Sequence, residues 1–332
     1  MIEKTRVLGL FHGLDECQGL WLGNPHPDTI KKYCESLGFP DFETIRVFLG
    51  DNCRWLMGEE YSYRDPEGRT LFEAFLQGKQ RPLEHCDSIR EIEQYPWPDP
   101  GFLRFEALKE ALMKQRSYVR FSGMWTPFFH LLADLFGMEQ YFINMHLKPA
   151  IVQAATEKVV DFYLEANRRC LEECGEEIDV FFFGNDFGTQ LDLLISPEMF
   201  QKFVLPYLKK IVELAKSHGL PVMLHSCGAI AKVIPILIDI GIDALHPLQA
   251  RARGMDAETL AKNFRGKLTF VGGVDTQDLL VNGSPDDVRR EVLRLRKTFK
   301  ERYIVSPSHE AVLPNVPFEN IEAMAKAAFE PL

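Results

Sequence analysis

From residue 118 onward, short apolar runs alternate with amphipathic stretches along the chain. The runs are YVRFSG (118–123), DVFFFGND (179–186), PVMLHSCG (221–228), DALHPLQ (243–249), LTFVGGVD (268–275) and YIVSPSH (303–309). Runs that are apolar at successive positions are typical of parallel strands whose two faces are both covered by helices. The pattern therefore predicts six β–α units in series, and a parallel sheet.

The stretches between these runs carry signals of helix boundaries. SPEMFQKFVLPYLKKIVELAKSHG (196–219) and SPDDVRREVLRLRKTFK (284–300) both begin with Ser-Pro, and the first ends in glycine. Proline is favoured at the first helical position and glycine just past the last one, so both stretches are predicted helices. PFENIEAMAKAAF (317–329) is predicted to be the final helix.

The first 117 residues are expected to supply two more units. The candidate strands are TRVLGLF (5–11) and the segments FETIRVFLG and NCRWLMG, around 43–58, with HPDTIKKYCESLG (26–38) as a helix. Eight units would close a TIM (β/α)8 barrel, a fold that suits a chain of 332 residues. The alternative is an open doubly wound sheet, but no phosphate-binding glycine fingerprint follows the early strands.

We therefore expect an α/β fold with one TIM barrel domain over residues 1–332, carrying irregular and helical additions on its N-terminal side. The polar, turn-rich segment 59–100 is predicted to be an excursion over one barrel end, made of a β-hairpin and a helix, rather than a separate domain.

Composition narrows the classes of partner. A net charge of −10 disfavours a general binder of nucleic acid or of anionic membranes. The longest apolar runs fall short of the roughly 18 residues that a membrane span needs, and no signal peptide is expected at the N-terminus. The seven cysteines, Cys17 among them, are irregularly spaced, which predicts a reducing, cytoplasmic location.

Polar and titratable residues follow six of the predicted strands. They are Ser122, Asn185-Asp186, His225 with Cys227, Gln249, Asp275, and Ser308-His309-Glu310. In a TIM barrel, the carboxyl ends of the strands form the active-site face. The coincidence across six strands indicates a functional site at that end of the barrel.

His225 and Cys227 stand two residues apart at the end of one strand, so their side chains point to the same face. An imidazole and a thiol in that arrangement are two ligands of a zinc site. The alternative is a buried histidine bonded to backbone, beside an inert cysteine. His246 precedes Pro247 inside a strand and is expected to point elsewhere. His309 ends the last strand and is the predicted third ligand, or else a histidine that contacts substrate without metal.

Five further residues are candidates for substrate or catalytic roles. Asp186 is an acid, a base or a polar ligand, or else it caps a turn, and Gln249 binds either substrate or a neighbouring loop. Trp125 is a candidate apolar wall. Asp275 either contacts substrate or caps the following helix, and Arg251 either meets a carboxylate or phosphate or lies in a solvated loop.

Four ordered blocks of the chain resemble the uroporphyrinogen decarboxylase superfamily. They are FGNDFGTQLDLLISPEMF, HSCGAIAKVIPILIDIGIDALHPLQ, FVGGVDTQDLL and SPSHEAVLPNVPFENIEAM. That superfamily holds the decarboxylases of haem biosynthesis and a large set of corrinoid-dependent methyltransferases, all on a TIM barrel.

The motifs favour the methyltransferase branch. The decarboxylases carry an N-terminal motif of the type RQAGRY and an FSDI-like segment, whereas this chain reads GLWLGNPHPDTIKKY in the comparable region and lacks FSDI. The methyltransferases bind zinc through an H-x-C pair, matched here by His225 and Cys227, and a late cysteine, whose place is taken by His309. The resemblance also carries over Asp186.

The resemblance implies a zinc-dependent methyltransferase that moves a methyl group between a small substrate, of methoxy, methylamine or thiol type, and a corrinoid. The corrinoid is expected on a separate carrier protein, because the chain has no D-x-H-x-x-G segment. The first alternative is a cofactor-free decarboxylase of uroporphyrinogen or a related acid, which would need cationic residues such as Arg251 and Arg253. The second is a barrel that binds a ligand without chemistry.

Overall fold

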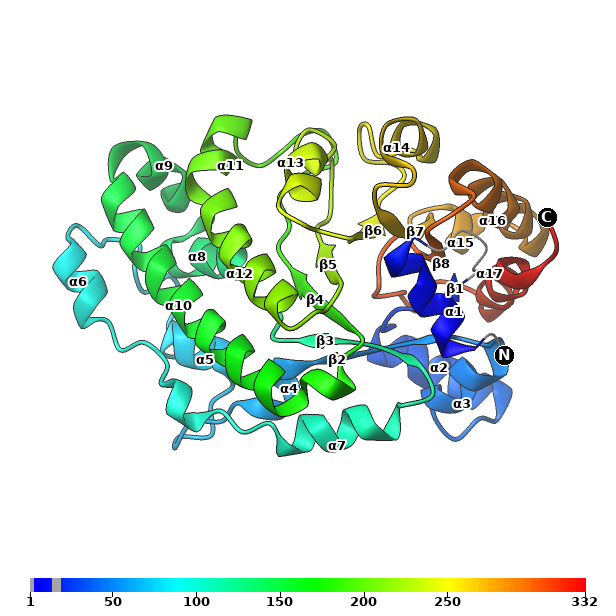
Figure 1. Ribbon diagram of the computed structural model, residues 1–332, viewed down its shortest axis with the longest axis horizontal. Coiled ribbons are helices and arrows are strands. Elements are labelled where there is room, and N and C mark those ends of the chain that lie inside the picture. The colour runs from blue at the N-terminus through cyan, green and yellow to red at the C-terminus, as the bar shows by residue number, and fades with distance from the viewer. Residues whose placement is uncertain (1–2, 14–18) are drawn as a thin grey trace.

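The protein forms a nearly closed barrel of parallel strands surrounded by helices (Figure 1), in a computed structural model that describes residues 3–13 and 19–332. The strands are β1 (Gly19–Leu20), β2 (Cys53–Met57), β3 (Val119–Gly123), β4 (Val180–Gly184), β5 (Val222–His225), β6 (Ala244–Leu248), β7 (Thr269–Val274) and β8 (Tyr303–Pro307). They follow the order β1-β8-β7-β6-β5-β4-β3-β2, and every neighbouring pair is parallel. The predicted TIM barrel is confirmed, and the open doubly wound alternative is wrong.

Asn52 joins the two edges of the sheet. Its backbone N–H donates to the carbonyl oxygen of Leu20 at 3.0 Å, and its side-chain Oδ1 accepts from the Leu20 N–H at 3.1 Å. Because these bonds satisfy backbone groups that an open edge would leave unpaired, they bring β1 and β2 together across the gap.

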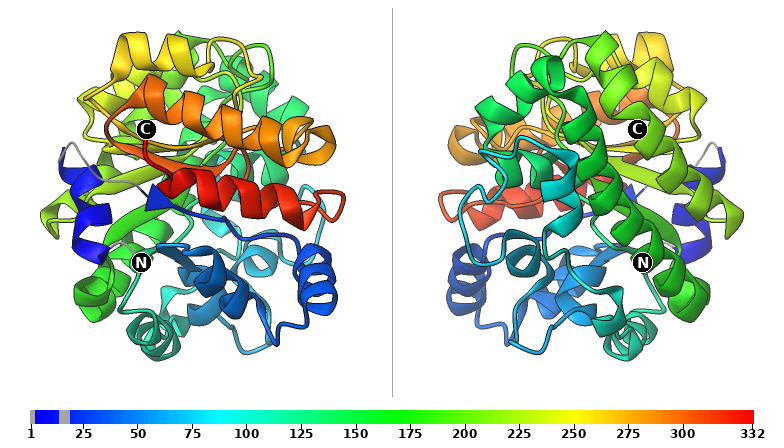
Figure 2. Two further views of the ribbon diagram at one scale, coloured as in Figure 1. Left: turned by 90° about the vertical axis from the view of Figure 1, so that its right-hand side faces the viewer. Right: turned by 90° about the vertical axis from the view of Figure 1, so that its left-hand side faces the viewer.

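The six strands predicted after residue 118 are all present, and helices lie outside them. These helices are α8 (Phe128–Phe136), α9 (Met138–Leu147), α10 (Pro149–Cys174), α11 (Pro197–Phe203), α12 (Leu205–Ser217), α13 (Ile234–Asp239), α14 (Ala257–Phe264), α15 (Leu279–Asn282), α16 (Pro285–Phe299) and α17 (Phe318–Phe329). Figure 2 shows α16 and α17 packed side by side on the outside of the barrel. The helix predicted over 196–219 is two helices, because the chain breaks at Val204 before Pro206.

The predicted strand at 5–11 is wrong, because this segment is the helix α1 (Lys4–Gly9) followed by a 3₁₀ turn, η1 (Leu10–His12). Val7, Leu10 and Phe11 have the i, i+3, i+4 spacing of a helix face, and they pack with the side chains inside the barrel. The Thr269 hydroxyl, at the start of β7, donates to the Leu10 carbonyl at 2.8 Å. The segment therefore closes the amino-terminal end of the barrel.

Of the other predictions for the N-terminal region, two are confirmed and one is wrong. NCRWLMG contains β2 and HPDTIKKYCESLG contains α2 (Pro27–Leu37), as predicted. FETIRVFLG is not a strand but the helix α3 (Phe42–Leu49), which begins where the Asp41 carboxylate accepts the Thr44 N–H. The strand that the sequence missed is β1, which has only two residues.

The predicted excursion contains helices but no hairpin. Residues 59–100 hold most of α4 (Gly58–Ser62), α5 (Leu71–Leu76), α6 (Ile89–Gln94) and the start of η2 (Pro100–Phe102), and α7 (Glu106–Lys114) follows. No strand is present between residues 59 and 100, so the predicted hairpin is wrong. Capping side chains at Thr70 and Ser88 start α5 and α6, which explains why the polar segment is helical.

The structure also bears on the predictions about membrane spans and cysteines. None of the helices within residues 3–13 and 19–332 has the length and apolar character to cross a membrane. Cys17 lies outside the described residues, and the other six cysteines are free thiols.

Candidate metal centre at the barrel mouth

His225 and Cys227 lie together where β5 ends. His225 is the last residue of the strand, and its Nε2 atom is 3.5 Å from the Cys227 Sγ. Gly228 has a φ of +86°, and a Cβ atom there would lie 2.3 Å from the Gly188 backbone. The glycine therefore lets the β5 and β4 loops approach closely, which keeps Cys227 at the mouth.

Asp186 joins this pair from the end of β4. Its Oδ1 atom lies 3.3 Å from His225 Nε2 and accepts the Cys227 N–H at 2.8 Å. One ligand atom from each of Asp186, His225 and Cys227 lies within 4.8 Å of the other two. A candidate metal centre therefore combines one carboxylate, one imidazole and one thiol.

The spacing of these atoms fits zinc. Zinc bonds of ~2.0–2.3 Å in a tetrahedral site place neighbouring ligand atoms roughly 3.3–3.7 Å apart. The two measured separations that involve His225 Nε2, 3.3 Å to Asp186 and 3.5 Å to Cys227, agree with this range. Nitrogen, sulfur and oxygen donors are all ligands that zinc accepts.

Two residues meet the other side of the His225 ring. His246 Nδ1 lies 3.1 Å from His225 Nδ1, and Glu310 Oε2 lies 3.7 Å from the same atom. The expectation that His246 points elsewhere is wrong, because β5 and β6 pair His225 with His246 in register and residues at one level of a barrel share its interior. His225, His246 and Glu310 form a second candidate metal group.

Buried polar atoms around His225 lack partners. Glu310 Oε2 and His246 Nε2 are both buried, and neither has a hydrogen-bond partner among the described residues. Unpaired polar atoms cost free energy in a protein interior, so they mark a place where a ligand or an ion would be bound.

The site has an acidic electrostatic character. Burial alone would lower the pKa of His225, but Glu310 and Asp186 outweigh burial and hold it well above its ordinary value. Burial would raise the pKa of Asp186, yet the hydrogen bond and charge of His225 bring it well below the usual range. Burial raises the pKa of the Cys227 thiol, and His225 offsets part of that rise. Surroundings that favour a protonated imidazole also favour a metal cation.

His309 lies nearby but outside both candidate metal groups. The centres of its ring and the His225 ring are 6.5 Å apart, and its Nδ1 atom accepts the Ala311 N–H at 3.1 Å. Its Nδ1 atom also lies 3.6 Å from Glu310 Oε2. The role of His309 as a third ligand stays a prediction, and Asp186 is the residue that the geometry places beside His225 and Cys227.

A cavity of about 350 Å³ opens beside this centre. It is lined by Phe72, Trp125, Pro127, His130, Leu131, Asp134, Gly184, Asn185, Asp186, His225, His309 and Glu310. Trp125 forms a wall, as predicted for an apolar side chain there, with its ring centre 5.1 Å from that of His225. No lysine or arginine is found among the described residues that line the cavity.

Gln249 holds the loop that carries Cys227. Its Oε1 atom accepts the Gly228 N–H and a hydrogen from the Gln190 amide, each at 3.0 Å. Both contacts are within the protein, so they correspond to the loop-binding interpretation of this residue.

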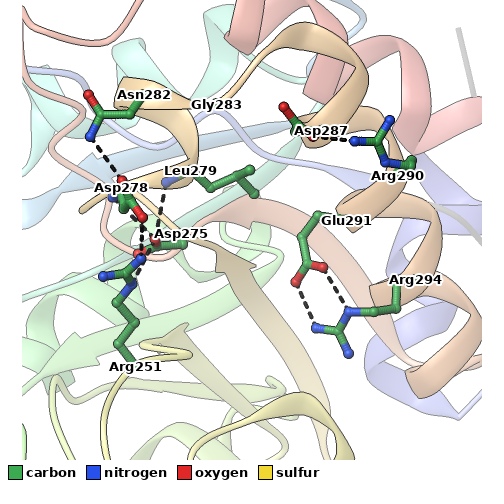
Figure 3. Close-up of a pocket in the computed structure, with 10 residues that line it drawn as sticks. All are labelled: Arg251, Asp275, Asp278, Leu279, Asn282, Gly283, Asp287, Arg290, Glu291 and Arg294. Carbon is green, nitrogen blue, oxygen red and sulfur yellow. Dashed lines mark hydrogen bonds and ion pairs between the residues drawn. The ribbon is translucent and has the colours of Figure 1, made fainter.

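Arg251 and Asp275 lie in a different pocket, shown in Figure 3. Arg251 pairs with Asp275 at 2.9 Å and with Asp278 at 2.7 Å, and its side chain is 49% exposed. Asp275 also accepts the N–H groups of Gln277, Asp278 and Leu279, which is the capping arrangement. The structure does not bring these two residues into the cavity beside His225.

Three residues of the site were not assigned a role from the sequence. Glu310 follows a strand, which is a usable signal, but the sequence favours His309 beside it as the ligand. For His246, the proline that follows it predicts a side chain that points elsewhere. His130 is on α8, and its Nε2 atom lies 3.6 Å from Asp186 Oδ2. No sequence signal distinguishes it from other histidines on helices.

The protein is a TIM barrel, and its candidate metal centre lies at the carboxyl ends of the strands, where TIM barrels carry their active sites. The family model described as uroporphyrinogen decarboxylase (URO-D) matches residues 82–330. The chain therefore belongs to the uroporphyrinogen decarboxylase family, which confirms the resemblance seen in the sequence.

Curated relatives come from both branches of the family. The methylcobamide:CoM methyltransferase MtbA of Methanosarcina mazei is 28% identical over 157 residues, which is 47% of this chain and 43% of that protein. The chain thus matches less than half of that relative's length. A uroporphyrinogen decarboxylase of Christiangramia forsetii is 25% identical over 261 residues, or 74% of this chain and 70% of the relative.

One solved structure supports the fold over the whole chain. A methyltransferase from Methanosarcina mazei superposes with a TM-score of 0.69, covering 98% of this chain and 97% of that one, at 16% identity. At that identity, the match shows a shared barrel architecture.

Proposed function

We propose that this protein is a zinc-dependent methyltransferase that moves a methyl group between a small substrate and a corrinoid held on a separate protein. The observation that carries the proposal is the grouping of Asp186, His225 and Cys227 within 4.8 Å at the active-site end of the barrel. The methyltransferase relatives, which include a methylated-thiol–coenzyme M methyltransferase of Methanosarcina mazei at 28% identity over 137 residues, support methyl transfer.

In this proposal, His225 Nε2, Cys227 Sγ and an Asp186 oxygen hold the metal, and Glu310 supports His225 from the far side of the ring. A histidine ligand usually has its second nitrogen bonded to a carboxylate or carbonyl, which fixes the ring and strengthens the ligand. Bound zinc would supply Lewis acidity, which activates a thiol or polarises the heteroatom that carries a methyl group. Trp125 excludes water from one side of the cavity.

The alternative of a cofactor-free decarboxylase lacks support at the cavity. A substrate with several carboxylates needs cationic partners, whereas the titratable groups that line the cavity are histidines and the carboxylates Asp134, Asp186 and Glu310. Arg251, one of the two arginines that the alternative relied on, is committed to Asp275 and Asp278.

The test is the zinc content of the purified protein together with methyl transfer to free cob(I)alamin, followed by its absorbance spectrum. We expect close to one zinc per chain, lost in His225→Ala and in Cys227→Ser. Asp192→Asn is the matched control, because Asp192 also follows β4 but pairs with Lys232 at the surface. A protein that stays free of zinc when zinc is supplied in excess would refute the proposal.

A further inference from the structure

The rings of His225 and His246 meet through the same nitrogen of each. The two Nδ1 atoms lie 3.1 Å apart, which is hydrogen-bond distance, and both side chains are buried in the barrel. A hydrogen bond between two imidazoles needs a proton on one of the facing nitrogens and a lone pair on the other. The contact therefore has a direction, and that direction decides which tautomer each histidine holds.

The candidate metal centre sets this direction. Cys227 Sγ lies 3.5 Å and Asp186 Oδ1 lies 3.3 Å from His225 Nε2, on the side of the ring that faces away from His246. A metal held by these three side chains uses the lone pair of His225 Nε2, so the proton of the neutral ring stays on Nδ1. With metal bound, His225 Nδ1 is the donor and His246 Nδ1 is the atom that can accept.

Glu310 is a second acceptor on the same side of the His225 ring, but it is farther away. Its Oε2 atom lies 3.7 Å from His225 Nδ1, which is beyond hydrogen-bond distance, whereas His246 Nδ1 is within it. The charge of Glu310 still acts across that gap, because Coulomb attraction falls only as the inverse of distance. Glu310 therefore contributes charge, and His246 offers the hydrogen bond.

The position of the His246 ring is fixed by the sheet and by aromatic packing. Strands β5 and β6 pair His225 with His246 in register, and the Ser226 N–H donates to the His246 carbonyl at 2.8 Å. The ring centre of His246 lies 4.7 Å from that of Trp21 and 5.6 Å from that of Phe182. A ring packed between two aromatic side chains in a dense interior has little freedom to turn away from His225.

The side chain of His246 makes one polar contact within the described residues, and that contact is with His225. Its Nε2 atom is buried and has no hydrogen-bond partner in the same part of the chain. An apolar side chain would fill the barrel interior without leaving a polar atom unpaired, which costs free energy. The contact with His225 is thus the interaction that requires an imidazole at this position.

We propose that His246 is a positioning residue of the metal centre. Its Nδ1 atom accepts the His225 Nδ1–H, and this bond holds the His225 ring with Nε2 toward Cys227 and Asp186. The proposal rests on the metal centre of the proposed function and is independent of the methyl transfer. Loss of an outer partner that orients a histidine ligand typically weakens metal binding about 10- to 100-fold.

Two substitutions of similar shape separate the hydrogen bond from the packing. Asparagine and leucine branch at the same carbon, but only asparagine offers an oxygen near the position of His246 Nδ1. In competition with a chromophoric chelator, His246→Leu should lower zinc affinity about 10- to 100-fold, and His246→Asn should stay within about threefold of the wild type. Both variants lose the ring that packs on Trp21, so a role in packing alone predicts equal losses. Equal zinc affinities in the two variants would overturn the proposal.

A measurement on the wild type keeps the test decisive if neither variant folds. The full-length, zinc-loaded protein is labelled with ¹⁵N in its histidines, and nitrogen NMR distinguishes ring nitrogens that carry a proton from those that do not. We expect a coupling across the hydrogen bond between two Nδ1 nitrogens, with the proton on the ring whose Nε2 binds zinc. A proton on the Nδ1 of the other ring, or no coupling, would overturn the proposal.

The outcomes also separate this inference from the proposed function. A wild-type protein that binds no zinc refutes the metal centre, and the positioning role falls with it. Zinc binding by the wild type with equal affinities in His246→Leu and His246→Asn refutes the positioning role alone. Zinc binding that is lost in His246→Leu and kept in His246→Asn supports the positioning role, even if no methyl group is transferred to cob(I)alamin. Val271→Ala, a packing change elsewhere in the barrel interior, is the control and should leave zinc affinity unchanged. A loss in Val271→Ala as large as that in His246→Leu would overturn the proposal.

Discussion

Two charged clusters follow the strands of this barrel, and they differ in how their charges are balanced. Around His225, the carboxylates Asp186 and Glu310 face imidazoles and a thiol, with no arginine or lysine among the described residues of the cavity. In the pocket of Figure 3, each arginine has a carboxylate partner: Arg251 with Asp275 and Asp278, Arg290 with Asp287, and Arg294 with Glu291.

The difference shows that a position after a strand is not sufficient to predict a functional site. In an exposed ion pair the two opposite charges neutralise each other, so little net charge remains to attract a ligand. Carboxylates that surround a buried imidazole leave an unbalanced negative charge, which attracts a cation. Charge balance, together with burial, therefore distinguishes the candidate metal centre from a surface network.

The sharpest test of the candidate metal centre around His225 compares Asp186 and His309, the two candidates for its third ligand. Asp186→Asn should lower zinc affinity roughly 1,000-fold, or about 4 kcal/mol, because one ligand supplies about a third of the binding free energy of a zinc site. His309→Gln should change zinc affinity less than about threefold. Competition with a chromophoric chelator measures both.

The opposite ranking would contradict this arrangement. If His309→Gln loses the metal and Asp186→Asn retains it, the sequence-based prediction of His309 as the third ligand holds instead. Asp192→Asn serves as the control in the same titration, because its carboxylate pairs with Lys232 outside the cavity.

Glu59 extends the comparison, because it is a buried carboxylate that no lysine, arginine or histidine pairs with in the described structure. Its pKa is raised to about 7, chiefly by burial. Between pH ~4.5 and ~7, the unfolded chain releases this proton while the folded protein keeps it, so stability falls as the pH rises. The loss reaches about 3 kcal/mol above pH ~7 for a shift of this size.

Glu59→Gln should remove that dependence. The free energy of unfolding of the variant minus that of the wild type should rise by up to about 3 kcal/mol between pH ~4.5 and ~7.5, measured by urea denaturation at each pH. Because the difference cancels groups common to both proteins, a flat difference across this range would show that Glu59 titrates normally.

A substitution at Glu310 tests whether its carboxylate strengthens metal binding by His225. Glu310→Gln keeps the shape but removes the charge 3.7 Å from His225 Nδ1. Loss of an outer carboxylate typically weakens metal binding by about 10- to 100-fold, so zinc affinity should fall within that range, below the effect of Asp186→Asn. A zinc affinity equal to that of the wild type would show that Glu310 does not contribute to zinc binding.

The sequence predicted the barrel well where strands are buried on both faces, as in DVFFFGND and LTFVGGVD. It failed at residues 5–11, where a short apolar run resembles a strand although Val7, Leu10 and Phe11 have the spacing of a helix face, and at β1, which is too short to leave a pattern. His225 and Cys227 were visible because they lie two residues apart at the end of one strand. Glu59 and His130 were not, because only the closure of the barrel brings these helix residues to the mouth.

Substitution of Arg251 should have the smallest effect on stability, zinc content and activity, in contrast to substitution of His225. Its pairs with Asp275 and Asp278 lie at the surface, where such pairs contribute at most about 1 kcal/mol. Arg251→Ala should therefore lower stability by no more than about 1 kcal/mol, and leave zinc content and kcat/KM for methyl transfer within about twofold. Asp275 would keep its capping bonds to Gln277 and Leu279, so the loop should retain its shape. A 100-fold loss of kcat/KM with zinc retained would instead make Arg251 a substrate-binding residue.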